Sequence, residues 1–141
     1  MKGIIFAILA GGFITLQGVA NTSISNGIGT WQAATITQFT GFIVALLVML
    51  SIGDRSWMGF KQVKPIYLVG GAFAAFVIFT NVKSIQLSSV TIAIAAVLIA
   101  QLTTAFIIEG KGWFEVAKQR MRMPQFLGLA LMIIGVLILT F

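Results

Sequence analysis

Side-chain amides stand inside the long apolar segments of this 141-residue sequence, among them Gln17, Asn21, Gln38 and Gln101. Gln17 and Asn21 are four residues apart, which places both on one face of a helix. A neutral amide donates and accepts hydrogen bonds at once, so a converging set could bind a polar molecule without burying a permanent charge. We therefore take these four amides as candidates for lining a polar pathway.

The alternative is that each amide only bonds to a neighbouring helix. Such bonds contribute on the order of 0.6 kcal/mol each, and at most about 1.7 kcal/mol. Polar groups inside a membrane usually face the bundle interior or a water-filled cavity, which favours the shared pathway.

Glu109 and Lys83 are charged residues that adjoin the apolar segments. Glu109 is the only carboxylate directly beside one, close to Lys111, and Lys83 follows Phe76 and Phe79 on one helix face. Placement at the membrane surface would explain both residues. Their functional alternatives are a gate or proton site at Glu109, and a cation at Lys83 that holds an anionic group beside aromatic faces.

The composition excludes most catalytic chemistry. With no Cys and no His, the sequence has no thiolate, imidazole base, disulfide or zinc site. No apolar segment holds a nucleophile pair or metal ligands, so we expect no enzyme, no cofactor and no metal. The net charge of +6 does not indicate a nucleic-acid partner, because the basic residues stand at segment ends rather than on a soluble basic face.

The apolar segments predict an all-α membrane protein with a single five-helix domain over residues 1–141. Hydrophobic residues make up 59% of the chain and charged residues 9%, with a mean hydropathy of +1.07. The expected spans are about 3–21, 31–52, 66–82, 89–108 and 125–141, each a helix because a backbone in lipid must satisfy its own hydrogen bonds. The stretch NTSISNGIGT is expected to be a loop, and Pro65 and Pro124 suit first helical turns.

The basic residues predict the orientation of the spans. With a cytoplasmic N-terminus, eight of the nine Lys and Arg residues fall on the cytoplasmic side, and only Lys83 falls outside. The eight are Lys2, Arg55, Lys61, Lys64, Lys111, Lys118, Arg120 and Arg122. Five spans then place Phe141 on the extracytoplasmic side.

Residues 109–124, EGKGWFEVAKQRMRMP, are expected to lie in the cytoplasmic headgroup layer as a short helix. Trp113, Ala117 and Met121 recur at helical spacing, and Lys118 and Arg122 lie on other faces.

Small residues indicate where the helices could pack, since close approach of backbones holds membrane helices together. The candidates for helix packing are Gly11, Gly18, Gly71, Ala75, Gly128 and Gly135. Five spans make a thin bundle with little room for a central pathway, so we expect a partner copy or a paralogue.

The successive segments resemble the YdcZ-like family of inner-membrane exporters, in the drug/metabolite transporter superfamily. The resemblance rests on LAGGFITLQGVANTSIS, WQAATITQFTGFIVAL, PIYLVGGAFAAFVIF, IAQLTTAFIIEGKGWF and RMRMPQFLGLALMIIGVLIL. Its most specific parts are Gln17 with Asn21, the segment 101–110, and the pattern from Gly128 to Gly135. The chain departs from the family at Ala100, where Gly is usual, and at Glu109, where Asp is usual.

The resemblance implies a five-helix half-transporter in a bacterial cytoplasmic membrane, related to ten-helix members built from two oppositely oriented repeats. We therefore expect an exporter of a small metabolite or amphipathic compound that works by alternating access between two halves. Its partner would be an oppositely oriented paralogue or a second, parallel copy. The competing hypothesis is a non-transporting membrane subunit that stabilises or regulates another complex. Because Gln17 does not titrate, coupling would come from Glu109 or from the partner's acid, or transport would be passive.

Overall fold

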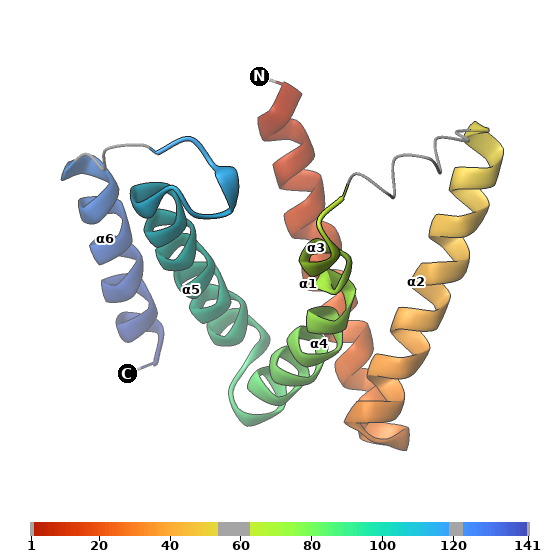
Figure 1. Ribbon diagram of the computed structural model, residues 1–141. Coiled ribbons are helices and arrows are strands. Elements are labelled where there is room, and N and C mark those ends of the chain that lie inside the picture. Colours follow the sequence, from red (N-terminus) through yellow and green to blue (C-terminus); the bar gives the residue numbers. More distant parts are fainter. Residues whose placement is uncertain (1, 54–62, 119–122, 141) are drawn as a thin grey trace. The chain divides into compact units, whose positions relative to one another are not determined.

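The structure is a computed structural model that describes the whole chain except residues 1, 54–62, 119–122 and 141. The described elements are α1 (Lys2–Ile28), α2 (Thr30–Ile52), α3 (Pro65–Leu68), α4 (Gly70–Leu87), α5 (Val90–Lys111), the 3₁₀ turn η2 (Trp113–Glu115) and α6 (Met123–Thr140) (Figure 1). All of these helices except α3 are long and apolar enough to cross a membrane. The structure thus confirms the prediction of five long apolar helices.

The chain divides into two compact units, Met1–Gln86 and Leu87–Phe141. The first unit holds α1 to α4, and the second holds α5, η2 and α6. Each unit is described by itself below.

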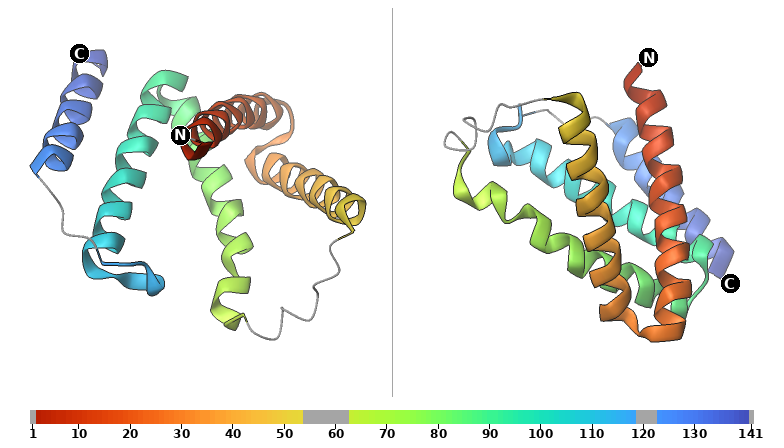
Figure 2. Two further views of the ribbon diagram at one scale, coloured as in Figure 1. Left: turned by 90° about the horizontal axis from the view of Figure 1, so that it is seen from above. Right: turned by 90° about the vertical axis from the view of Figure 1, so that its right-hand side faces the viewer.

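In the first unit, α1 and α2 form a V that closes at a very short turn (Figures 1 and 2). Gly29 makes this turn with a φ of +100°, a conformation that favours glycine. Its N–H donates to the Ser25 carbonyl at 2.9 Å, and its own carbonyl accepts from the Ala33 N–H at 3.1 Å. Hydrogen bonding therefore continues from one helix into the next with almost no loop.

The loop predicted for residues 21–30 is wrong, because α1 continues through most of it to Ile28. The polar residues there are compatible with a helix because their hydroxyls have partners. Thr22 donates to the Gly18 carbonyl at 2.8 Å, and the Ser25 and Thr30 hydroxyls lie 2.9 Å apart. Turn-forming residue types therefore predicted the loop wrongly, because their side chains form hydrogen bonds within the folded unit.

The third predicted span is interrupted and shifted. A one-turn helix, α3, begins at Pro65, and α4 begins after Val69 with two consecutive glycines. The Ala72 N–H donates to the Val69 carbonyl at 2.9 Å, which is the tighter three-residue spacing of a 3₁₀ turn. The helix then runs to Leu87, beyond the expected end at residue 82. Two adjacent glycines favour this break because glycine is a poor helix former.

In the second unit, α5 and α6 pack against each other. The Ser89 hydroxyl caps α5 by accepting from the Ile92 N–H at 3.3 Å, and Gly112 ends the helix with a φ of +69°. Pro124 lies in the first turn of α6, as its sequence position predicts.

The short helix predicted for residues 109–124 is wrong in its described part. After α5 the chain forms only the 3₁₀ turn η2, and Val116 is extended. Phe114 has a φ of 58°, so the backbone leaves the helical conformation there. The helix had been predicted from the spacing of Trp113 and Ala117. Arg120 and Arg122, together with Arg55 and Lys61, lie outside the described residues.

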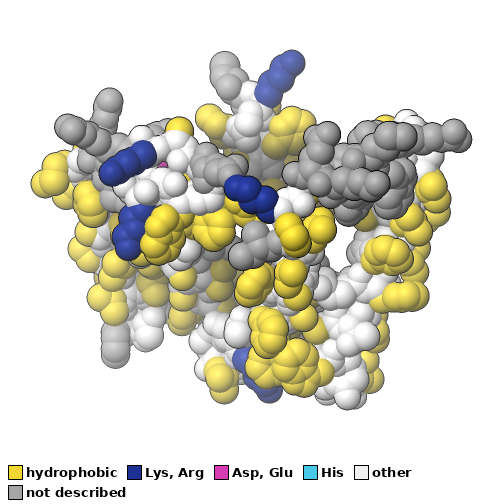
Figure 3. All heavy atoms as spheres, viewed as in Figure 1, with side chains coloured by type: hydrophobic (Ala, Val, Ile, Leu, Met, Phe, Trp, Pro, Cys, Tyr) yellow, Lys and Arg dark blue, Asp and Glu magenta, His cyan; other side chains and the backbone are white. Residues whose placement is uncertain are grey.

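The apolar core of the described residues is small, and all of its buried members except Ala93 of α5 lie in the first unit. Ala34, Ile78 and Val82 form its cluster between α2 and α4. Most other large apolar side chains are exposed along the helices, and they cover much of the face drawn in the space-filling view (Figure 3). A surface of this kind suits lipid, which replaces water around the helices.

Candidate functional site

Among the described residues of the first unit, four polar side chains are buried, and we call them the polar seam: Asn21, Ser25, Thr30 and Asn81. They come from the end of α1, the start of α2 and the second half of α4. The seam is therefore built where α4 meets the closed end of the V formed by α1 and α2. It lies among helices whose exposed side chains are mainly apolar.

Asn21 joins α1 to α2. Its side-chain oxygen accepts a hydrogen bond from the hydroxyl of Thr37, and only 4% of Asn21 is exposed. This predicted pathway residue thus lies inside the unit, with its oxygen already engaged.

A second set of bonds joins α1 to α4. The Gln86 amide donates to the Ser25 hydroxyl at 3.2 Å and to the Asn26 side-chain oxygen at 2.9 Å. Ser25 also pairs with Thr30, so three helices share one chain of polar groups. Neutral groups of this kind can hold an uncharged polar group or water without a buried charge.

Asn81 is the exception in the seam. It is 9% exposed, and its side-chain oxygen is buried with no hydrogen-bond partner among the described residues. A buried acceptor without a donor costs about 1–3 kcal/mol. The oxygen faces Gly18, where an added Cβ would lie 3.3 Å from it and 3.3 Å from the Ile85 side chain. Glycine at position 18 permits this close approach of α1 and α4.

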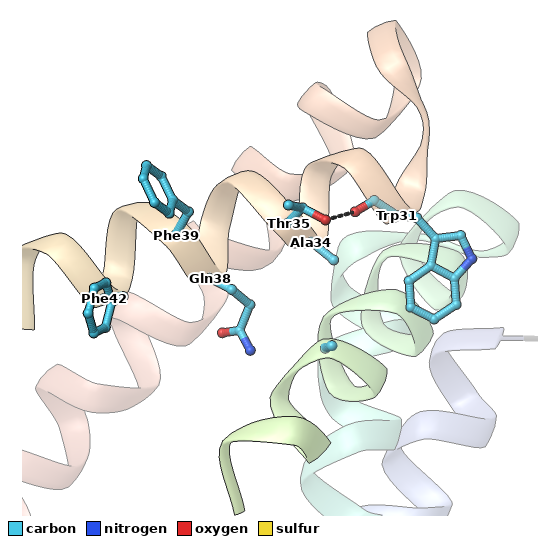
Figure 4. Close-up of a pocket in the computed structure, with 7 residues that line it drawn as sticks. Trp31, Ala34, Thr35, Gln38, Phe39 and Phe42 are labelled. Atoms are coloured by element: carbon cyan, nitrogen blue, oxygen red, sulfur yellow. Dashed lines mark hydrogen bonds between the residues drawn. The ribbon is translucent and has the colours of Figure 1, made fainter.

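Gln38 lies outside the seam, on the side of α2 that faces α4. Its amide nitrogen donates to the Gly71 carbonyl at 3.2 Å, just after the break between α3 and α4. Gln38 also lines an open groove with Trp31, Thr35 and Ala75 among others (Figure 4).

The other two predicted pathway amides are exposed. Gln17 lies on the outer surface of α1, in a shallow groove with Phe13, Leu16 and Ala20 among its neighbours. Gln101 is exposed on α5, in the second unit. The first unit therefore brings Asn21 and Gln38 between helices, but it leaves Gln17 facing outward despite its spacing from Asn21.

The two charged candidates lie near helix ends. Glu109 is half-buried in the last turn of α5, and nearby the Lys111 ammonium lies 4.6 Å from the centre of the Trp113 ring. Lys83 is exposed on α4, four residues after Phe79, whose ring stacks on Trp31.

Among the predicted packing residues, Gly18 makes the close contact described above, and Ala75 is half-buried beside the groove. A Cβ added at Gly11, Gly71, Gly128 or Gly135 would have no neighbour within 4 Å. A packing role for these four glycines stays a prediction that a partner subunit would have to fulfil.

Sequence reasoning missed Asn81, Ser25 and Gln86. Asn81 is an amide inside a predicted span, so the rule that selected Gln38 could have selected it too. Ser25 was assigned to a loop, and Gln86 stood beyond the expected end of the third span. Their partners become visible only once α1 and α4 are known to extend further.

Among the residues that the structure describes, no group of three His, Cys, Asp or Glu side chains could hold a metal ion.

Comparison with known proteins gives one match. Residues 3–138 match the family described as "Putative inner membrane exporter, YdcZ". No curated protein matches the chain, and no solved structure matches it. The family match, with the five apolar helices, supports the predicted location in the inner membrane.

Proposed function

Because this chain belongs to the YdcZ family of inner membrane exporters, we propose that it exports a small metabolite or amphipathic compound by alternating access. Membership in an exporter family agrees with the expectation of a transporter rather than an enzyme. The substrate class, the pathway and the assembly below are our proposals.

The observation that carries the proposal is the unpaired oxygen of Asn81 in the polar seam. An isolated polar group buried among apolar helices is costly, and polar groups in membrane proteins usually face a cavity or pathway. We propose that in another conformation α4 moves away from Gly18, so that water or a polar group of the substrate donates to Asn81. Asn21 and Gln38 line the same pathway, with Gln17 and Gln101 contributing from their exposed faces.

We propose that the five helices form one domain that is half of a ten-helix transporter with inverted repeats. The N-terminus is cytoplasmic in this arrangement, and Phe141 is extracytoplasmic. The strong basic bias opposes insertion of the same chain in both directions. The partner is therefore an oppositely oriented paralogue, or a second copy in a parallel homodimer.

Coupling involves charges outside the apolar centre of the spans. In the proposed orientation, Glu109 is the gate or proton site at the cytoplasmic end, and Lys83 is the cation that holds an anionic group at the outer mouth. Either Glu109 takes part in coupling, the partner supplies an acid, or transport is passive.

The experiment compares Asn81→Val with Thr80→Val, on the same helix. Valine at position 81 removes the unpaired oxygen with little change in volume, so we expect the fold to persist. The Thr80 hydroxyl is exposed and donates only within its own helix, to the Phe76 and Val77 carbonyls. Cells expressing each variant at equal membrane level are compared with wild type by mass spectrometry of their growth medium. Asn81→Val should lose the compounds that wild type exports, and Thr80→Val should retain them; equal export by both variants would contradict the proposal.

The competing function is a non-transporting subunit, and the bonds of Asn21, Gln38 and Gln86 between helices favour it. In that function the amides only hold helices together. The double variant Gln17→Leu with Gln101→Leu separates the two, because both side chains are exposed. An exporter should lose flux while it stays folded, whereas a structural subunit should keep its partner and its effect.

A further inference from the structure

The segment that follows α5 in the second unit exposes apolar side chains. We call residues 111–118 the aromatic loop; it begins at the last residue of α5 and includes the turn η2 (Figure 1). Trp113 is 51% exposed, Phe114 63% and Val116 43%. The loop directly continues a helix that is apolar enough to cross a membrane, so we expect these side chains at the depth of the lipid headgroups. Aromatic side chains at this depth anchor a chain to the boundary between headgroups and acyl chains.

The backbone of the aromatic loop turns back on the end of α5. Gly112 ends the helix with a φ of +69°, and its N–H donates to the Ile108 carbonyl at 2.8 Å. A Cβ added at Gly112 would lie 3.4 Å from the Lys118 Cβ and 3.5 Å from the Val116 carbonyl oxygen. Lys118 therefore returns to the helix end at which Lys111 stands, although it follows much later in the sequence.

Two lysines thus share one end of α5 with the exposed aromatic rings. The side chains of Lys111 and Lys118 are both exposed. The Lys111 ammonium lies 4.6 Å from the centre of the Trp113 ring, which is within the range of a cation–π contact. This contact keeps a cation beside a ring that is itself suited to the headgroup layer.

The aromatic loop and the residues beside it carry a positive net charge. Residues 109–122 hold four basic and two acidic residues, which gives a net charge of +2. Arg120 and Arg122 lie outside the described residues and enter only this count of charges. A cluster of Lys and Arg immediately beside a membrane-spanning helix attracts anionic lipids. A zwitterionic headgroup is attracted less, because its own cation offsets its phosphate.

The position, the rings and the charge of the loop favour the same occupant. A soluble anion would use the cations but not the exposed rings, and an acyl chain would use the rings but not the cations. A phospholipid of net negative charge offers a phosphate to the lysines and an acyl boundary to the rings. We infer that the aromatic loop binds anionic phospholipid headgroups through Lys111 and Lys118. This inference concerns lipid binding alone, so it holds or fails independently of the proposed export.

Quenching of tryptophan fluorescence by brominated lipids tests the inference at the loop itself. Trp31→Phe and Trp57→Phe leave Trp113 as the sole tryptophan of the full-length chain. The protein is placed in bilayers of phosphatidylcholine and phosphatidylglycerol, in which one lipid or the other carries bromine on its acyl chains just below the headgroup. Quenching of Trp113, relative to unbrominated bilayers of the same composition, gives the relative affinity of the loop for the two headgroups.

Phosphatidylglycerol should be preferred at Trp113 by about fivefold, which is the effect of roughly one basic residue at a membrane surface. Lys111→Gln combined with Lys118→Gln should lower this ratio to about twofold or less. Both side chains are exposed, so the fold should persist. The matched control combines Lys2→Gln with Lys83→Gln, which removes the same charge from exposed positions of the first unit and should leave the ratio unchanged.

Equal quenching by the two brominated lipids in the chain with Trp113 alone would overturn the inference. So would equal effects of the two double variants, because the preference would then reflect the net charge of the whole chain. Glycerol phosphate, added at millimolar concentration and constant ionic strength, should leave the ratio unchanged. Loss of the preference in its presence would assign the site to a soluble phosphate instead. If circular dichroism shows that the Lys111 and Lys118 double variant has lost helix, Lys118→Gln alone provides the test, with Lys83→Gln as its control.

Discussion

The two units of this chain are built from similarly apolar helices, yet they use their polar side chains differently. In the second unit, the hydroxyls of Thr103, Thr104 and Thr140 each donate a hydrogen bond to a carbonyl of their own helix. In the first unit, Asn21 and Gln86 reach across to other helices. Overall apolarity therefore identifies the spans, while side-chain hydrogen bonds between helices identify where the first unit holds its polar seam.

The helix α4 shows the difference most clearly. It is the least apolar of the five candidate spans and has the largest buried share. The interrupted start at Val69 and the unpaired oxygen of Asn81 both belong to it. A helix that combines a break with an unsatisfied buried group is the element of this unit best suited to move.

The largest expected effect comes from enlarging Gly18 in the first unit, with Gly128 in the second unit as the matched control. Gly18→Leu places side-chain atoms against Asn81 and Ile85, so it should lower the free energy of unfolding by about 1–3 kcal/mol. The Cβ of Gly128→Leu would have no neighbour within 4 Å, so this variant should leave the free energy of unfolding unchanged. Unfolding of the purified protein in detergent, followed by circular dichroism, measures both. Equal loss in the two variants would mean that the units do not differ in packing at these positions.

A smaller effect is expected from the bond between α1 and α2. A double-mutant cycle with Asn21→Leu and Thr37→Val should give a coupling free energy of at most about 1.7 kcal/mol. The single variant Thr103→Val in α5 should lower the free energy of unfolding by less than the single variant Thr37→Val does. The Thr103 hydroxyl bonds only within its own helix. A coupling of zero between Asn21 and Thr37 would remove this contrast between the units.

The smallest effect concerns the local cap of the second unit. Ser89→Ala removes the acceptor for the Ile92 N–H and should cost about 1 kcal/mol or less of unfolding free energy. Hydrogen exchange should rise in the first turn of α5 and stay unchanged in α1. Faster exchange throughout the chain would indicate that the cap acts beyond its own helix.

Much of the fold could be predicted from the sequence, because continuous apolar runs leave helices as the way to satisfy the backbone in lipid. Boundaries were less predictable. The stretch from Thr22 to Ile28 has loop-forming residue types, but contacts with Thr30 and Gln86 satisfy them within a helix. After Lys111 the prediction was wrong in the opposite direction, because a helix was expected and none forms. Gly112 ends α5, although the apolar residues beyond it recur at helical spacing.

The candidate site was predictable in kind but not in detail. The sequence showed that amides enter the spans, and Asn21 and Gln38 do lie between helices. It could not show that Gln17 is exposed. The spacing of two residues along a helix places them on one face, but it does not say which face packs against a neighbouring helix. The chain of bonds from Asn26 to Gln86 joins residues far apart in sequence, so local patterns carried no signal for it.

Thiol accessibility at Asn81 tests most directly whether the polar seam opens to water. The chain has no native cysteine, so Asn81→Cys and Val82→Cys each carry a single thiol on the same helix, and Val82 is fully buried in the apolar core. Both are treated in intact membranes with a maleimide that does not cross lipid. The account predicts that Asn81→Cys is labelled and that Val82→Cys is not. Failure to label Asn81→Cys from either side of the membrane would contradict it.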